Sequence, residues 1–123
     1  GDDEISNVLQ AFAKDHDDSR TIPVNEDGER QRILIKDIIY VEGYGKYCII
    51  RTKNGTFQSS KTLSEVYFNL PQGYFFKTHR SYIVNMDYIK SYTDKTITFE
   101  NGEKALISRE RFAEFKKLFA YFK

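Results

Sequence analysis

Short β-type segments separated by turn signals run through residues 21–107, and they constrain the fold more than any other feature. β-branched and aromatic residues fill the segments, while turn residues such as Asp27-Gly28 and Asn54-Gly55 separate them. The Asn54-Gly55 pair is typical of a tight primed turn. Strands are predicted at 21–25, 30–35, 38–42, 47–52, 56–59, 75–78, 82–85, 88–92, 96–99 and 104–107. A mainly β domain is therefore expected, and the pattern leaves sandwich, barrel and stacked hairpins open.

Two helices are predicted among and after these strands. Residues 62–70 place apolar side chains on one face, and Thr62 followed by Glu65 has the sequence pattern of a capping box. Ser108 is a suitable N-cap for a C-terminal helix whose Phe and Leu side chains recur at helical intervals. We therefore expect a short middle helix and a longer C-terminal helix.

The first 20 residues differ from the rest in pattern and charge. Residues 4–14 have helical spacing with acids at the start, and 15–20 form a polar run that predicts a linker. The net charge of +1 combines six acids and two bases in residues 1–20 with 17 bases and 12 acids beyond them. We expect an N-terminal helix and acidic linker at 1–20, followed by a basic domain at 21–123 that a polyanion would attract.

The length of 123 residues fits one domain, and ten Phe and nine Tyr supply large side chains for a small core. No apolar run approaches the roughly 18 residues of a membrane span, so no membrane contact is expected. Cys48 is the single cysteine, which excludes an internal disulfide and fits a cytoplasmic location. Its apolar neighbours predict a buried structural thiol rather than a reactive one.

Residues 75–85 place three basic side chains between an aromatic pair and a β-branched run. The flanking residues favour strands, so Lys77, His79 and Arg80 are expected at a rigid bend that presents Arg80 outward. The planar guanidinium group suits phosphate oxygens or the acceptor edge of guanine. A solvated basic turn is the alternative interpretation.

This segment, Phe-Phe-Lys-Thr-His-Arg-Ser-Tyr-Ile-Val-Asn, resembles the signature of the LytTR DNA-binding domain, an output module of bacterial response regulators. Three further motifs occur in the family's order, at 38–47, 62–66 and 108–111, and the resemblance extends over roughly 22–122. It implies an elongated stack of small antiparallel sheets with DNA-contacting loops along one side. It also implies sequence-specific binding of double-stranded DNA, self-association on direct-repeat promoter sites, and an upstream receiver or sensor domain in the full-length protein.

The resemblance implies base contacts from Arg80, because the matching position of the family points into the major groove. Arg109 and Arg111 at the start of the last helix, and Lys46 in the loop after the third predicted strand, are the other base-contact candidates. The chain departs from the family at Glu110, where a carboxylate would repel phosphate but can accept from a cytosine amino group. Whether Arg109 or Arg111 contacts bases is therefore left open.

Contacts to the DNA backbone are expected from polar side chains beside these positions. The candidates are Lys77, His79, Ser81, Tyr44, Tyr47 and Ser108. Lys46 is equally suited to a phosphate, and the glycines of its loop would permit close approach of the DNA. His79 is equally suited to a hydrogen bond that holds the turn. For the loop that carries Lys46, the alternative is an ordinary hairpin loop. For the start of the last helix, the alternative is a helix start held by salt bridges.

Catalysis, metal binding and a cofactor are not expected. His16 and His79 are the only histidines, and neither lies in a nucleophile-elbow context. The acids beside His16 occupy the predicted linker, which favours a solvated run over a metal site.

Two other functions stay open. Single-stranded nucleic acid could stack on the many aromatic side chains, although most of these fall at positions expected to be buried. A cytoplasmic protein-interaction module could use strand edges or the aromatic C-terminal helix. Salt dependence separates this module from a DNA-binding domain, because phosphate contacts weaken steeply as salt rises.

Overall fold

The computed structural model describes residues 20–122 as two antiparallel sheets and two α-helices. The large sheet has seven strands in the order β2-β1-β5-β4-β3-β7-β6, and the small sheet has three in the order β10-β9-β8. The elements are β1 (Thr21–Glu26), β2 (Glu29–Leu34), β3 (Ile38–Gly43), β4 (Cys48–Thr52), β5 (Gly55–Ser59), α2 (Leu63–Phe68), β6 (Phe75–His79), β7 (Tyr82–Asn85), β8 (Ile89–Tyr92), β9 (Thr96–Phe99), β10 (Lys104–Leu106) and α3 (Arg109–Phe122). The mainly β prediction is confirmed.

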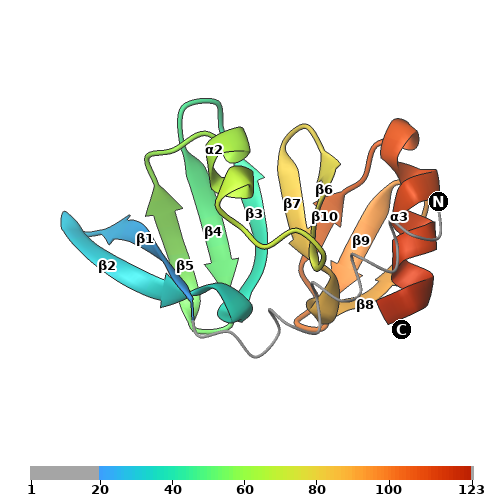
Figure 1. The fold of residues 1–123 in the computed structure, drawn as a ribbon, viewed down its shortest axis with the longest axis horizontal. Coiled ribbons are helices and arrows are strands. Elements are labelled where there is room, and N and C mark those ends of the chain that lie inside the picture. The colour runs from blue at the N-terminus through green and yellow to red at the C-terminus, as the bar shows by residue number, and fades with distance from the viewer. Residues whose placement is uncertain (1–19, 123) are drawn as a thin grey trace.

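The molecule is elongated, with the β1–β2 hairpin at one end and α3 at the other (Figure 1). The helix and linker predicted at 4–20 lie outside the described residues, apart from residue 20.

Two apolar cores lie on opposite faces of the large sheet, because successive side chains of a strand point to opposite faces. On β3, Val41 belongs to the core under α2, while Tyr40 belongs to the core under the small sheet and α3. On β7, Ile83 and Val84 divide in the same way. The ring of Tyr40 stacks on Phe99 of β9 with 4.7 Å between centroids, which joins the two sheets.

The predicted capping box of α2 is confirmed. The Thr62 hydroxyl accepts from the Glu65 N–H at 3.2 Å, and the Glu65 carboxylate accepts from the Thr62 N–H at 2.9 Å. The C-terminal helix begins directly after Ser108, as the sequence predicts. Across residues 20–122, no helix combines the length and the apolar character needed to cross a membrane.

The two turn signals have different outcomes. Asp27 and Gly28 connect β1 to β2 with φ angles of 51° and 81°, as a primed hairpin turn requires. The β4–β5 turn instead consists of Lys53 and Asn54, and Gly55 opens β5 with φ 141°. Asn54 does not have a positive φ, so the primed turn predicted at Asn54-Gly55 is wrong.

Ile35 and Tyr88, which the sequence predicts to lie in strands, instead belong to short 3-10 helices at Ile35–Asp37 and Met86–Tyr88. Buried Asn85 explains the second of these. Its side-chain oxygen accepts from the Asp87 N–H at 2.9 Å, and its amide donates to the Ile38 carbonyl at 2.8 Å. The side chain therefore bends the chain after β7 and joins it to the start of β3.

Cys48 is fully buried at the start of β4, as predicted, and burial raises the pKa of its thiol to about 11. We expect iodoacetamide to modify it only when the domain opens, because the reacting thiolate is both inaccessible and disfavoured. The rate in native protein should be lower than in denaturant by a factor of at least about 10³. Mass spectrometry of time points measures both rates, and rapid modification of native protein would contradict the buried assignment.

Candidate nucleic-acid interface

The three segments that the sequence predicts to contact DNA lie side by side on one edge of the molecule. The β3–β4 loop, the β6–β7 turn and the start of α3 form the upper edge in Figure 1. The Gly43 N–H donates to the Ser81 carbonyl at 2.8 Å, which joins the loop to the turn. The Ser108 N–H donates to the Thr78 carbonyl at 2.8 Å, which joins the start of α3 to β6. Main-chain hydrogen bonds therefore hold the candidate segments together.

The β6–β7 turn presents Arg80 to solvent. Within residues 20–122 its side chain has no hydrogen bond or ion pair. His79 holds the turn, because its Nδ1 accepts from the Ser81 N–H at 3.0 Å. Its ring also packs edge-to-face with that of Tyr82, with 5.8 Å between the centroids. With Nδ1 as acceptor, the neutral ring carries its proton on Nε2, which stays able to donate.

Helix α2 supports this edge from one side. A Cβ atom at Gly43 would lie 3.0 Å from the Cβ of Leu63, so the missing side chain allows α2 to pack closely. The sequence suggests that the glycines of this loop allow DNA to approach the main chain. At Gly43 the residue that approaches closely is Leu63. Lys77 is half-buried, with its Nζ 3.5 Å from the Ser64 hydroxyl of α2. Ser81 is also half-buried.

The β3–β4 loop combines an exposed cation with exposed rings. The Tyr44 N–H donates to the Tyr47 carbonyl at 2.8 Å, and Gly45 between them has φ 77°. The rings of Tyr44 and Tyr47 stack with 5.4 Å between centroids and are 49% and 37% exposed. Lys46 is exposed at the tip, and its side chain makes no hydrogen bond or ion pair within residues 20–122. The loop therefore offers a cation beside an aromatic surface.

The start of α3 brings Arg109, Glu110 and Arg111 to the same edge, all of them exposed. The Arg111 guanidinium lies over the ring of Phe76, 6.0 Å from its centroid, a distance typical of a cation–π contact. Within the described part of the chain, Arg109 and Glu110 have no side-chain partner. The salt-bridged helix start that the sequence left open is therefore not formed among these residues. Arg109 is the less constrained of the two arginines.

Glu42, at the end of β3, is a member of this edge that the sequence analysis missed. Its carboxylate accepts from Arg51 of β4, with 2.7 Å between the closest atoms, and from the hydroxyls of Tyr44 at 3.2 Å and Tyr82 at 3.4 Å. The negative charge of Glu42 is the main cause that raises the pKa of Tyr44, and burial is the main cause for Tyr82. A glutamate at the end of an otherwise apolar strand was the available signal. Its partner could not be identified, because Arg51 lies nine residues away and meets Glu42 only through the register of β3 and β4.

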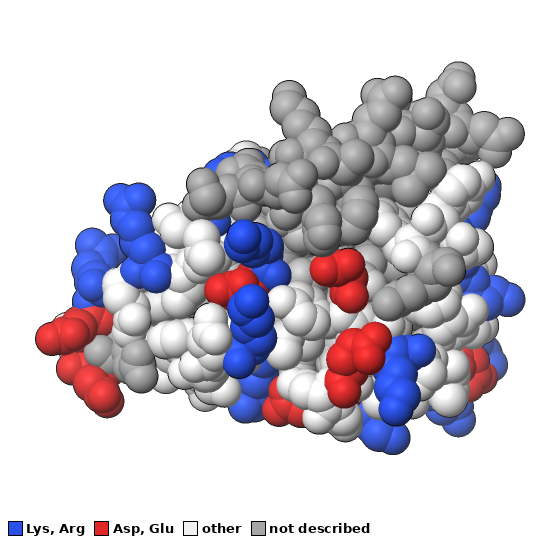
Figure 2. Space-filling model, turned by 90° about the horizontal axis from the view of Figure 1, so that it is seen from below, with Lys and Arg blue, Asp and Glu red and all other residues white. Residues whose placement is uncertain are grey.

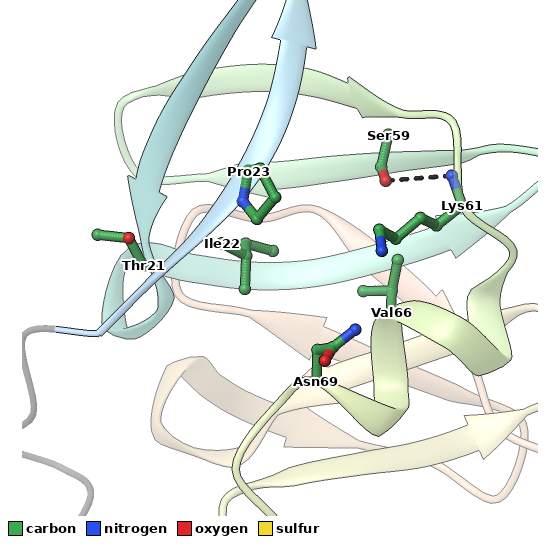
Figure 3. Close-up of a pocket in the computed structure, with 7 residues that line it drawn as sticks. All are labelled: Thr21, Ile22, Pro23, Ser59, Lys61, Val66 and Asn69. Atoms are coloured by element: carbon green, nitrogen blue, oxygen red, sulfur yellow. Dashed lines mark hydrogen bonds between the residues drawn. The ribbon is translucent and has the colours of Figure 1, made fainter.

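The other surfaces have a different character. The face seen in Figure 2, at the opposite ends of the strands, carries Lys and Arg close to Asp and Glu on its described part. A hollow of about 210 Å³ between β1 and α2 is lined by Ile22, Pro23 and Val66 together with polar side chains that include Lys61 (Figure 3). This volume lies below the roughly 300–1,000 Å³ typical of small-molecule sites. Among residues 20–122, no three His, Cys, Asp or Glu side chains are grouped as a metal site requires.

The sequence of the chain matches a known family of domains. The sequence model of the LytTr DNA-binding domain matches residues 29–120. The transcriptional regulatory protein NatR of Bacillus subtilis is 32% identical over 104 residues, which cover 80% of this chain and 45% of NatR. The heme-containing CO-sensing transcriptional regulator RcoM 2 of Paraburkholderia xenovorans is 29% identical, over 79% of this chain and 39% of that protein. The chain therefore spans less than half the length of these curated relatives.

The fold is similar to that of a solved domain. The LytTr DNA-binding domain of a Bacillus cereus protein, described as a methyl-accepting/DNA response regulator, superposes with a TM-score of 0.70. The two are 25% identical, and the match covers 80% of this chain and 94% of that domain. From the family match over most of its length and from this fold, the chain belongs to the LytTr DNA-binding domain family.

Proposed function

We propose that this domain binds double-stranded DNA in a sequence-specific way through the edge formed by the β3–β4 loop, the β6–β7 turn and the start of α3. The observation that carries the proposal is the common placement of the exposed cations Lys46, Arg80 and Arg109 on segments joined by main-chain hydrogen bonds. Cations on segments held together in this way fit a duplex, because phosphate contacts fix the register and a few donors then meet base edges.

In this proposal Arg80 contacts a base in the major groove, since it is exposed and unpaired within residues 20–122. Arg109 is the second base contact, because Arg111 is packed against Phe76 and suits a phosphate better. Glu110 is exposed beside Arg109 and can accept from a cytosine amino group at the same site.

The backbone contacts are assigned to half-buried and loop side chains of the same edge. His79 donates through Nε2, since its Nδ1 is occupied by the turn. Lys77, Ser81, Tyr47 and the half-buried Ser108 reach neighbouring phosphates from β6, the turn, the loop and the start of α3.

We further propose that the domain is the output part of a longer cytoplasmic regulator with an upstream receiver or sensor domain. The matched relatives are regulators more than twice as long as the matched region, which supports this assignment. Two copies on direct repeats about one helical turn apart, roughly 34–36 Å, would place both edges on one side of the duplex.

Selection of bound sequences from a random duplex pool tests the proposed function. Enrichment of one motif, with binding that weakens steeply as salt rises, is the expected result. Binding with little salt dependence would favour the protein-interaction module. Preference for single strands over duplexes would favour stacking on the aromatic side chains.

Lys46→Ala is expected to weaken binding to all duplexes about equally, because a phosphate contact is independent of sequence. The slope of log affinity against log salt should decrease by about 0.9, the value for one lost phosphate contact. Titration of cognate and scrambled duplexes at several salt concentrations measures both effects. A loss confined to the cognate duplex would instead assign Lys46 to a base.

A further inference from the structure

Glu42 joins two of the segments assigned to DNA. One carboxylate oxygen accepts from Arg51, with 2.9 Å to Nε and 2.7 Å to Nη2. The other accepts from the hydroxyl of Tyr44, in the β3–β4 loop, and from that of Tyr82, the first residue of β7 after the turn. The side chain is only 15% exposed, so these donors take the place of water.

An acid on a DNA-binding edge has an unfavourable effect unless its charge is balanced, because it repels phosphate. The positive charge of Arg51 balances the negative charge of Glu42, and their distance of 2.7 Å is typical of a strong charge-assisted hydrogen bond. The pair therefore allows a carboxylate to bind the two tyrosine hydroxyls without leaving a net charge near the duplex.

We propose that Glu42 is a positioning residue for DNA recognition, which fixes the β3–β4 loop relative to the β6–β7 turn through Tyr44 and Tyr82. The inference rests on the proposed function, because it concerns the spacing between the loop that carries Lys46 and the turn that carries Arg80. Main-chain bonding joins the ends of β3 and β7 through their antiparallel ladder, which pairs Glu42 with Tyr82, and through the bond from Gly43 to Ser81. The ladder ends before the loop tip, so the Tyr44 contact is what attaches the loop itself by a side chain, while the Tyr82 contact holds the carboxylate against β7.

The contact also determines which part of Tyr44 meets the DNA. Its hydroxyl is occupied by Glu42, while its ring is 49% exposed and stacked on Tyr47. Tyr44 therefore presents an apolar ring face to a sugar or a thymine methyl group. The hydroxyl contact to phosphate that the sequence suggested is replaced by this ring contact in our proposal.

Glu42→Gln provides the test, because the two possible roles of the acid predict opposite signs. A positioning role predicts about fivefold weaker binding to the cognate duplex, the difference between a charged and a neutral hydrogen bond. An acid that only repels phosphate predicts tighter binding to every duplex. Asp87→Asn is the matched control, since it removes the same charge from an exposed residue of the 3-10 helix after β7. Unchanged or tighter binding by Glu42→Gln would overturn the proposal.

A double-mutant cycle with Tyr44→Phe tests the connection between the two residues. If Glu42 acts through the Tyr44 hydroxyl, the double variant should bind no more weakly than Glu42→Gln alone. Additive losses would overturn the proposal, because they would place the Tyr44 hydroxyl on the DNA. Tyr44→Phe removes only an exposed hydroxyl group. If Glu42→Gln lowers the thermal stability of the domain, DNA binding by Tyr44→Phe alone still tests whether this hydroxyl matters.

Tyrosine titration supplies a readout that needs no DNA. In Glu42→Gln the pKa of Tyr44 should fall, because Glu42 is the main cause that raises it. NMR of ring-labelled tyrosine follows this residue, and an unchanged titration would show that the contact is absent in solution. A wild-type domain that binds no duplex would refute the proposed function, whereas a binding domain with an unaffected Glu42→Gln variant would refute only the positioning role.

Discussion

Arg80→Ala is expected to weaken binding to the cognate duplex by about 1–3 kcal/mol while leaving the fold intact. The side chain is exposed and makes no hydrogen bond or ion pair with residues 20–122, so its removal breaks no polar interaction among them. The loss should be much smaller on a scrambled duplex, because a base contact forms only on the matching sequence. Titration of both labelled duplexes at one salt concentration measures the difference.

Lys46→Ala is the control for Arg80→Ala, since it also removes one exposed cation from the same edge. It should reduce affinity for the two duplexes equally. If Arg80→Ala behaves in the same way, Arg80 contacts a phosphate and base recognition must come from the start of α3. Circular dichroism of both variants checks that the fold is retained.

Phe115→Ala is expected to lower the free energy of unfolding by about 3–5 kcal/mol. The side chain is fully buried in the second core, where its ring lies 5.1 Å from that of Tyr92 and 6.2 Å from that of Phe76. Its removal would leave a cavity between α3, β6 and β8. Because most small domains are stable by only about 5–15 kcal/mol, this single change threatens the fold. Urea denaturation followed by circular dichroism gives the difference.

Phe68→Ala is the matched control, because it makes the same substitution at a side chain that is 86% exposed at the end of α2. Its effect should stay within about 0.5 kcal/mol. Equal destabilisation by the two variants would contradict the burial of Phe115 against the small sheet. A large effect of Phe115→Ala alone would assign the attachment of α3 to this side chain.

The sequence predicts most of the secondary structure, because its signals are local. The capping box of Thr62 and Glu65 requires only residues within one helical turn, and the structure confirms both of its hydrogen bonds. The predictions fail where a distant partner decides the conformation. The 3-10 helix after β7 depends on the Asn85 side chain, which reaches the Ile38 carbonyl 47 residues away.

The candidate site is predicted to a similar degree. The residues that carry exposed cations follow from motif and composition, and the structure places Arg80, Lys46 and Arg109 on one edge. The sequence does not decide between a DNA contact and a turn-holding role for His79, since only the folded geometry shows its Nδ1 accepting from the Ser81 N–H. Glu42 was missed for a related reason, because its donors come from three separate elements.

Besides the side-chain bonds of Glu42, two main-chain hydrogen bonds join the segments proposed to contact DNA, from Gly43 to Ser81 and from Ser108 to Thr78. Their formation does not depend on the identity of the exposed side chains beside them. If the edge contacts DNA as proposed, sequence preference is therefore separable from folding in this domain. At the proposed interface, the exchange of one exposed side chain would therefore change the preferred DNA sequence while the main-chain platform stays the same.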